Sequence, residues 1–358
     1  MSATLKKLEQ LAKATVQAVE RKKDPHLRVP TRTLANTKFN TKKQLLELGD
    51  QVQQREFFNV GQAKKFMQTF LIASACKTLI KADKTTSIRD LYYMTKRTLA
   101  NSRENTFEEQ EESDPIIEDL EVTIDALREE LHLFAARRGL MVGELTVVDK
   151  GDTIDLRRQG SGGWGVPSIV EDDIIQFKRC DAKFILLVEK DAVFNRLNED
   201  KFWRKHKCIL LHGQGMPPRG VRRLVRRMTE ELDLPVFVLV DNDPWGFYIY
   251  SVVKQGSINL AYESVRMAVP GARFLGLSSF DAQKYGLKHP IKLNDQDEKR
   301  AKQMLAYPWF EKKEWRREID HMLKSGNKYE LEALSGRGVT FISDEYLPQK
   351  LKQQDWLA

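Results

Sequence analysis

Residues 236–250 read VFVLVDNDPWGFYIY, and this stretch decides the fold. The apolar run Val236–Val240 has the length of a buried strand, and Pro244 suits the first turn of a following helix. Two similar runs, Phe184–Val188 and Cys208–Leu211, come earlier in the chain. Expected helices cover residues 191–205, 219–232 and 245–255, and a further strand covers Arg273–Leu277. This alternation predicts an α/β fold with a mostly parallel, Rossmann-like sheet.

Carboxylates stand at the ends of two of these strands. Glu189 directly follows one strand, and Asp241 and Asp243 directly follow another. The carboxyl ends of parallel strands are where ligands bind, and residues two apart in an extended chain point the same way, with Asn242 pointing away. Acids at strand ends also commonly cap helices or bond to turn amides. Three clustered carboxylates repel one another unless a cation lies among them, and oxygen ligands at a phosphate-handling site favour Mg²⁺.

A tyrosine pair forms the second candidate site. Residues 85–93 read TTSIRDLYY, where a threonine or serine can cap a helix. On that helix Arg89 lies one turn before Tyr93, so its guanidinium can assist the phenol as a nucleophile on a phosphodiester. The alternative is that Tyr92 and Tyr93 are both packing residues with solvated hydroxyls.

The pattern changes character before residue 170. Residues 60–138 look mostly helical, and a long helix over residues 116–138 is expected to end at Gly139. Alternating segments at Gly143–Val148 and Thr153–Arg157 then predict a hairpin. Helices followed by a small hairpin fit a winged-helix domain, a fold that often binds duplex DNA.

Charge is unevenly distributed along the chain. Lysine and arginine total 59 and aspartate and glutamate 51, a net charge of +8 that suits a polyanionic partner. Residues 108–121 contain eight acids and no base, so the rest of the chain carries +16. One helical face collects Arg219, Arg222, Arg223, Arg226 and Arg227. That face is either solvated or a row of phosphate contacts.

Several classes of protein are excluded. Cys76, Cys180 and Cys208 lie far apart without a CxxC pair, which argues against a disulfide framework or zinc ribbon and for a reducing compartment, the cytoplasm. No apolar run is long enough to cross a membrane, and MSATLKKLEQ at the start lacks the apolar core of a secretory signal. The glycine-rich segment Gly160–Gly165 lacks the lysine of a P-loop.

Taken together, the motifs resemble a known family over nearly the whole chain, from about Arg32 onward. They are SIRDLYY (87–93), EEQEESDPIIEDLE (108–121), VEKDAVFNRL (188–197), VLVDNDPWGFYIYS (238–251), ELEAL (330–334) and DEYLPQKL (344–351). The family is that of the DNA-cleaving A subunits of archaeal-type DNA topoisomerase VI, related to the transesterases that make meiotic double-strand breaks. The resemblance implies an N-terminal helical extension at 1–60, a winged-helix (CAP-like) domain at 61–165 and a Toprim domain at 166–358.

The resemblance also implies roles for single residues. Tyr93 would be the nucleophile, Arg89 would assist at the scissile phosphate, and Arg138 falls where relatives often carry a basic residue, a candidate DNA contact. Glu189, Asp241 and Asp243 match the Toprim acids and would hold Mg²⁺. The expected DNA contacts also include Arg219, Arg222 and Arg223. Many family members have glycine where this sequence has Asn242.

The implied activity is DNA cleavage within a type IIB topoisomerase, an ATP-dependent isomerase that relaxes and decatenates DNA. The chain would act in the nucleoid as a homodimer within an A2B2 heterotetramer, with the tyrosine of one protomer meeting the metal site of the other. ATP would be hydrolysed by the B-type partner of topoisomerase VI, a GHKL ATPase, and residues 5–22, an amphipathic helix, are the candidate docking element. Alternatives are a Toprim-type Mg²⁺-dependent nuclease, a break-forming relative that does not reseal DNA, and a non-catalytic DNA-binding scaffold.

Overall fold

The computed structural model describes residues 2–358; Met1, the first residue of the expected extension, lies outside them. The chain divides into two compact units. The first unit runs to Asn36 and resumes over Leu48–Ala136, and the second comprises Thr37–Glu47 and Arg137–Ala358. These limits differ from the boundaries at residues 60 and 165 expected from the sequence.

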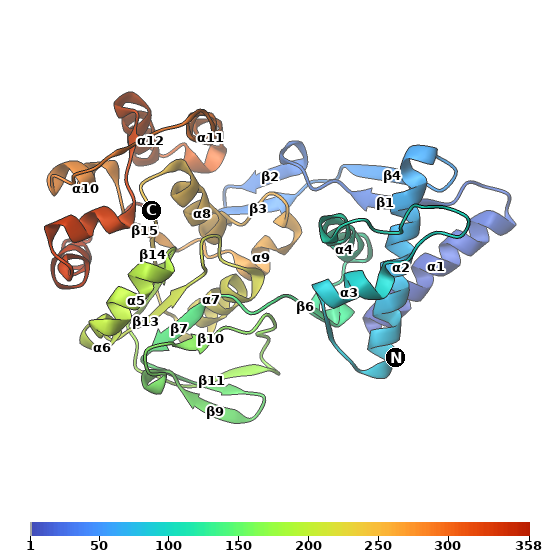
Figure 1. Ribbon diagram of the computed structural model, residues 1–358, viewed down its shortest axis with the longest axis horizontal. Helices are drawn as coiled ribbons and strands as arrows, with labels where there is room; N and C mark the ends of the chain where they lie inside the picture. Colours follow the sequence, from blue (N-terminus) through green and yellow to red (C-terminus); the bar gives the residue numbers. More distant parts are fainter. Residues whose placement is uncertain (1) are drawn as a thin grey trace. The chain divides into compact units, whose positions relative to one another are not determined.

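The first unit is a small helical domain edged by short strands (Figure 1). Its helices are α1 (Ala3–Glu20), α2 (Val60–Ala82), α3 (Ile88–Thr95) and α4 (Gln110–Ile124), with short 3-10 helices at Leu34–Asn36 and Glu129–Leu131. Its strands are β1 (His26–Pro30), β4 (Val52–Glu56), β5 (Thr86–Ser87) and β6 (Leu133–Phe134). Strands β1 and β4 pair antiparallel, and β5 and β6 pair parallel.

The core of the first unit joins its helices. Ile72 of α2, Leu91 of α3 and Ile117 of α4 are fully buried in one apolar cluster. Leu8 of α1 belongs to the same cluster, so the first half of α1 packs back on the domain, while Val16 and Val19 near its end stay more than half exposed. The helix predicted at residues 5–22 is therefore present, and only its second half offers an apolar face to solvent.

The prediction of a long helix over residues 116–138 is wrong. Helix α4 begins earlier, at Gln110, contains Pro115 inside it, and ends at Ile124 because Asp125 adopts a left-handed conformation with φ of 48°. The chain then forms a 3-10 turn and β6. Gly139 does have a positive φ of 88°, but no helix precedes it. Glycine adopts the left-handed conformation more readily than aspartate, so Gly139 is the stronger helix-ending signal in the sequence. Asp125, where the helix does end, was therefore not predicted.

The second unit is built on a six-stranded sheet in the order β10-β7-β13-β12-β14-β15. Its strands are β7 (Leu140–Gly143), β10 (Trp164–Gly165), β12 (Phe184–Val188), β13 (Cys208–His212), β14 (Val236–Leu239) and β15 (Arg273–Gly276). The last four run parallel, and β7 and β10 are antiparallel additions at one edge. The prediction of a mostly parallel α/β sheet is confirmed.

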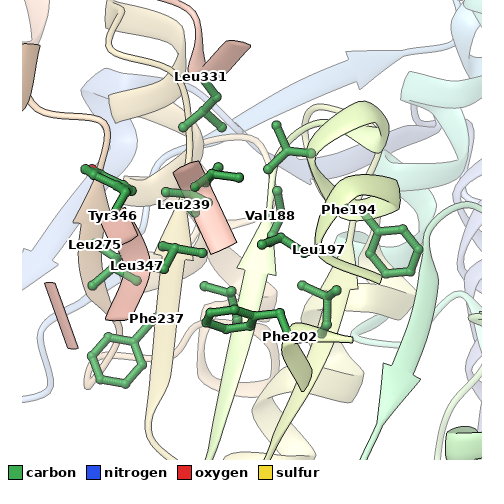
Figure 2. Close-up of a cluster of buried hydrophobic side chains, with 14 of the residues drawn as sticks. Val188, Phe194, Leu197, Phe202, Phe237, Leu239, Leu275, Leu331, Tyr346 and Leu347 are labelled. Carbon is green, nitrogen blue, oxygen red and sulfur yellow. The ribbon is translucent and has the colours of Figure 1, made fainter. Parts of the chain in front are cut away.

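Helices cover both faces of this sheet. On one face, α5 (Asp191–Glu199), α6 (Phe202–Lys205) and α13 (Leu347–Gln353) bury side chains against alternate strand residues, as Figure 2 shows for Phe194, Val188 and Leu239. On the other face, Phe247 and Tyr250 of α8 (Pro244–Gln255) meet the ring of Phe274 edge to face. Strand residues buried on both sides are the reason why these strands are continuously apolar.

The remaining elements of the second unit surround that sheet. They are β2 (Thr37–Asn40), β3 (Leu45–Leu48), β8 (Leu145–Asp149), β9 (Asp152–Asp155), β11 (Ile175–Cys180), β16 (Ile291–Lys292) and β17 (Asn327–Lys328), with α7 (Arg219–Leu232), α9 (Ser264–Met267), α10 (Ser279–Lys284), α11 (Asp295–Leu305) and α12 (Lys313–Ser325). Short 3-10 turns lie at Leu156–Arg158, Ala261–Glu263, Pro308–Phe310 and Leu331–Arg337, and a π-helical turn lies at Ile342–Tyr346.

The hairpin expected as the wing of the first domain forms, but it belongs to the second unit. Strands β8 and β9 pair antiparallel, and β11 adds to β8 to make a three-stranded sheet. Pairing with β11, which lies just before the parallel sheet in the sequence, ties the hairpin to the second unit. No helix within residues 2–358 has the length and apolar character needed to cross a bilayer.

Candidate active site

Three acids follow the carboxyl ends of β12 and β14, adjacent strands of the sheet. Glu189 follows β12 and accepts a hydrogen bond at Oε2 from the backbone N–H of Asp241, at 3.0 Å. Asp241 Oδ1 accepts from the backbone N–H of Leu331 at 2.8 Å. Asp243 caps α8, where its Oδ1 accepts from the N–H of Gly246 at 2.6 Å. The first two acids are thus linked directly, as the parallel-sheet argument predicted.

The turn that carries the two aspartates is fixed on its far side. Asn242 is fully buried, and its backbone exchanges two hydrogen bonds with Tyr329, at 2.9 and 3.0 Å. Its side-chain amide donates to Ser279 Oγ at 3.2 Å and to Glu318 Oε1 at 3.3 Å. Gly246 allows the start of α8 to approach closely, because a Cβ there would lie 2.4 Å from the carbonyl oxygen of Asp241. Asn242 therefore points away from the carboxylates and holds their backbone.

The pKa values of all three acids are raised. Burial, followed by repulsion from Asp241, raises the pKa of Glu189 to about 7. Burial also raises the pKa of Asp241 to about 6, against the opposing hydrogen bonds from Leu331 and Lys190. Burial raises the pKa of Asp243 as well. Buried carboxylates that repel one another in this way favour a bound cation.

One lysine lies against this group. Lys190 Nζ is 2.9 Å from Asp241 Oδ2, 2.7 Å from Glu332 Oε2 and 3.5 Å from Glu330 Oε2. Burial acts to lower the pKa of Lys190, but its hydrogen bonds to Glu332 and Asp241 raise it above the usual range. Lys190 was not predicted from the sequence, although it stands next to Glu189; the signal available was its position in VEKD, directly after a candidate ligand.

The donor set has the chemistry of a site for a hard divalent ion. Carboxylate oxygens are the ligands that Mg²⁺ selects, and these lie in a partly buried, negatively charged setting. Within residues 2–358, however, no three His, Cys, Asp or Glu side chains converge closely enough to surround one ion. Asp241 is turned toward Lys190 and Leu331, and Asp243 toward its helix cap. The residue types fit the ion, while each acid has at least one carboxylate oxygen engaged in a hydrogen bond or ion pair.

The two tyrosines of α3 differ sharply in environment. Tyr92 is buried, and its hydroxyl donates to the carbonyl oxygen of Glu108 at 2.8 Å and accepts from Lys96 Nζ at 2.7 Å. Tyr93 is 60% exposed. Arg89, one turn earlier on the same helix, is exposed too. Of the pair, only Tyr93 can reach an external phosphodiester without unfolding.

The helix itself is well determined by the sequence. Ser87 caps α3 by accepting from the N–H of Asp90 at 3.0 Å, as a serine before a helix should. Ile88 and Leu91 then bury one side of the helix, and Tyr92 completes that side. The opposite side carries Tyr93 out into solvent.

The arginines of α7 do not form an open row. Arg222 and Arg227 are buried, and Arg227 donates to the carbonyl oxygen of Ile175 at 2.8 Å. Arg223 pairs with Glu171 at 2.9 Å, and Arg219 pairs with Glu263. The predicted phosphate contacts Arg219, Arg222 and Arg223 are thus partly or largely buried, because the helix packs on two sides. Arg138, in contrast, is exposed in the segment before β7.

The acidic run at residues 108–121 has a structural role that the sequence did not reveal. Arg55 Nη2 lies 2.7 Å from Asp119 Oδ2, and Arg128 Nε lies 2.6 Å from Glu121 Oε1. Arg32 pairs with both Glu118 and Asp119. The arginines come from three separate segments of the first unit, so ion pairs connect α4 to several parts of that unit.

An exposed tyrosine on a helical unit and acids at the strand ends of a parallel sheet are the features that the resemblance to type IIB DNA topoisomerases implies. Family models agree: one for type IIB DNA topoisomerases matches residues 64–133, and one for the Toprim domain of topoisomerase 6 A subunits and Spo11 matches residues 184–351. The chain belongs to the family of topoisomerase VI A subunits, which are the DNA-cleaving components of type IIB topoisomerases.

Curated relatives align along almost the whole chain. The chain is 43% identical to the type 2 DNA topoisomerase 6 A subunit of Pyrococcus abyssi, over 98% of this chain and 94% of the relative. It is 42% identical to that of Pyrococcus horikoshii, with the same coverage. A plant relative, the DNA topoisomerase 6 A3 subunit of Oryza sativa subsp. indica, is 36% identical over 92% of this chain and 73% of its own length.

Proposed function

We propose that this chain cleaves duplex DNA by transesterification, with Tyr93 as the nucleophile. The observation that carries this assignment is the contrast within α3, where Tyr93 is exposed while Tyr92 is buried and hydrogen-bonded at its hydroxyl. The Tyr93 phenolic oxygen attacks phosphorus, the bond from phosphorus to the 3′ oxygen breaks, and the 3′ oxygen takes up a proton. The phenol proton passes to solvent. The product is a 5′-phosphotyrosyl link, and reversal of the step reseals the strand.

Arg89 supports that step from the same face of α3. Residues four apart lie on one side of a helix, so Arg89, which is exposed, brings a positive charge to the face of α3 that carries Tyr93. The same charge stabilises the extra negative charge on the phosphate oxygens during attack.

The strand-end acids are assigned to Mg²⁺. Glu189, Asp241 and Asp243 would hold the ion, which would supply Lewis-acid stabilisation of the scissile phosphate. Asn242 keeps the backbone of both aspartates in place through Tyr329. Lys190 neutralises Asp241 and has Glu332 beside it as an alternative partner, so it can release Asp241 when a divalent ion enters.

The chain is further proposed to act with partners. Two copies would cut the two strands, each tyrosine meeting the metal site of the other copy, within an A2B2 assembly that works on DNA in the cytoplasm. The B-type ATPase would supply ATP hydrolysis, since this sequence has no P-loop. Val16 and Val19, on the exposed second half of α1, are the proposed docking surface for it. We propose that the helices of the first unit belong to the winged-helix domain and that the second unit carries the Toprim domain.

The deciding experiment traps the covalent intermediate. The complex with the B-type ATPase is incubated with supercoiled plasmid, Mg²⁺ and a non-hydrolysable ATP analogue, then denatured and analysed for protein attached to 5′ ends. Tyr93→Phe should give no adduct and no double-strand breaks. Tyr92→Phe is the matched control: it should keep the adduct and lose about 1 kcal/mol of stability from its hydrogen bond. Breaks made by Tyr93→Phe would instead indicate a metal-dependent nuclease.

A further inference from the structure

Arg300 of α11 is held by two aromatic rings of α8, the helix that Asp243 caps. Its guanidinium carbon lies 4.5 Å from the ring centroid of Trp245 and 4.6 Å from that of Tyr248, both on α8. Guanidinium stacking on aromatic rings is favourable and restricts the side chain to few rotamers. Its N–H donors lie in the plane of the group, so stacking leaves them available at the edge.

The positive charge of Arg300 has no acidic partner. Throughout residues 2–358 the structure shows no carboxylate within 4.0 Å of its guanidinium nitrogens. Asp297, one turn earlier on α11, is already engaged by Lys328 at 2.8 Å and by the N–H of Asn294 at 3.1 Å. Arg223 and Arg226 on α7, by comparison, each pair with a glutamate, at 2.9 and 2.7 Å.

Two structural connections fix the position of Arg300 relative to the strand-end acids. Trp245 comes two residues after Asp243, at the start of α8, and is 41% exposed. At the other side, Lys328 pairs with Asp297 on α11, and the next residue, Tyr329, pairs with the backbone of Asn242 between the two aspartates. The start of α11 is therefore fastened to the turn that carries the candidate metal ligands.

We propose that Arg300 binds a backbone phosphate of the DNA at the edge of the acidic site, with Trp245 and Tyr248 fixing its orientation. The proposal rests on the proposed function in taking DNA as the ligand. A fixed arginine can meet two phosphate oxygens at once, and little side-chain entropy is lost on binding because the stack has already ordered it. It also supplies positive charge beside the strand-end acids, which by themselves repel a phosphate backbone.

The test is a salt series of DNA binding by the full chain. Fluorescence anisotropy with a labelled duplex is measured over a series of salt concentrations for the wild type, Arg300→Gln and Arg300→Lys. Arg300→Gln should weaken binding about ten-fold and reduce the slope of log affinity against log salt by about 0.9, the loss of one phosphate contact. Arg300→Lys should keep the slope and recover only part of the affinity, since a lysine binds phosphate as a point charge.

Two further variants separate binding from packing. Trp245→Ala should weaken binding a few-fold with an unchanged slope, because the charge remains while its orientation is lost. Arg226 is paired with Glu230 in the wild type, so Arg226→Gln should leave both affinity and slope unchanged. Thermal melting of each variant confirms that it is folded.

The outcomes are distinct. Wild-type affinity and slope in Arg300→Gln would overturn the proposal and leave the stack as a packing contact between α8 and α11. A wild-type chain whose DNA affinity does not respond to salt would contradict the proposed function itself. At saturating DNA, Arg300→Gln should still form the Tyr93 adduct. Weaker DNA binding together with a retained adduct would support Arg300 as a phosphate contact and Tyr93 as the nucleophile independently.

Discussion

Two groups of acids in this molecule look alike in the sequence and differ in what surrounds them. On α4, Asp119 and Glu121 are met by arginines that arrive from other segments of the first unit. At the ends of β12 and β14, Lys190 forms an ion pair with Asp241, and burial raises the pKa of both Glu189 and Asp241. The first group is neutralised internally and stabilises the fold. The second is left with excess negative charge, which is the condition for binding a cation.

The comparison predicts opposite stability effects when one acid is removed from each group, and this is the largest effect expected. Glu121→Gln should lower the free energy of unfolding by about 3 kcal/mol, because it leaves the partly buried Arg128 without its close partner. Glu189→Gln should raise the stability of the metal-free protein at neutral pH, because it removes a buried charge that repels Asp241. Urea denaturation in EDTA measures both. Equal losses of unfolding free energy in the two variants would contradict the proposed difference between the two groups of acids.

The pH dependence should follow the strand-end acids. Their folded-state pKa values, about 7 for Glu189 and about 6 for Asp241, lie above their ordinary values of 4.5 and 3.8. The native protein therefore holds protons that the unfolded chain has lost, and this site makes the metal-free protein less stable as pH rises from about 4 to 7. Metal affinity should rise over the upper part of that range, because the ion needs ionised ligands.

Denaturation curves in EDTA at several pH values between the ordinary and the raised pKa of Glu189 check this dependence. The difference between the wild type and Glu189→Gln isolates the contribution of that carboxyl, because titrations elsewhere in the chain cancel in the difference. The stability advantage of Glu189→Gln should grow as pH rises. An advantage that stays constant across the series would show that Glu189 ionises normally.

Lys190 should produce the smallest effect. Lys190→Gln removes the cation that competes for Asp241, so affinity for Mn²⁺, a spectroscopic substitute for Mg²⁺, should rise a few-fold. The metal-free variant should also be less stable, because Asp241 loses its partner. Electron paramagnetic resonance of free Mn²⁺ measures the affinity directly. A fall in affinity would show that Lys190 orients the ligands rather than competing with the ion.

The same contrast explains what the sequence could and could not predict. The strands of the parallel sheet and helix α7 were predictable because buried runs and amphipathic patterns are local in the sequence. The juxtaposition of Glu189 with Asp241 followed from the rule that ligands gather at the carboxyl ends of parallel strands. The ion pairs of α4 did not follow, because Arg32, Arg55 and Arg128 reach it through tertiary packing that no spacing encodes.

The burial and pairing of the α7 arginines were unpredictable for a similar reason. A run of arginines at helical spacing is equally compatible with an exposed face and with a helix packed on two sides, as α7 is. Only the tertiary structure shows that Arg223 meets Glu171, which lies far away in the sequence. Arg300 could not be singled out from the sequence, because its aromatic partners lie on another helix.

The assignment of the strand-end acids to a metal is tested most directly by calorimetric titration of Mn²⁺ into three forms of the full chain: wild type, Glu189→Gln and Glu118→Gln. The two substitutions make the same chemical change, one at the strand ends and one in the paired acids of α4. We predict that the wild type and Glu118→Gln bind alike and that Glu189→Gln binds about ten-fold more weakly or worse, of the order found when metal sites are perturbed. Unchanged binding by Glu189→Gln, or an equal loss in Glu118→Gln, would contradict the assignment.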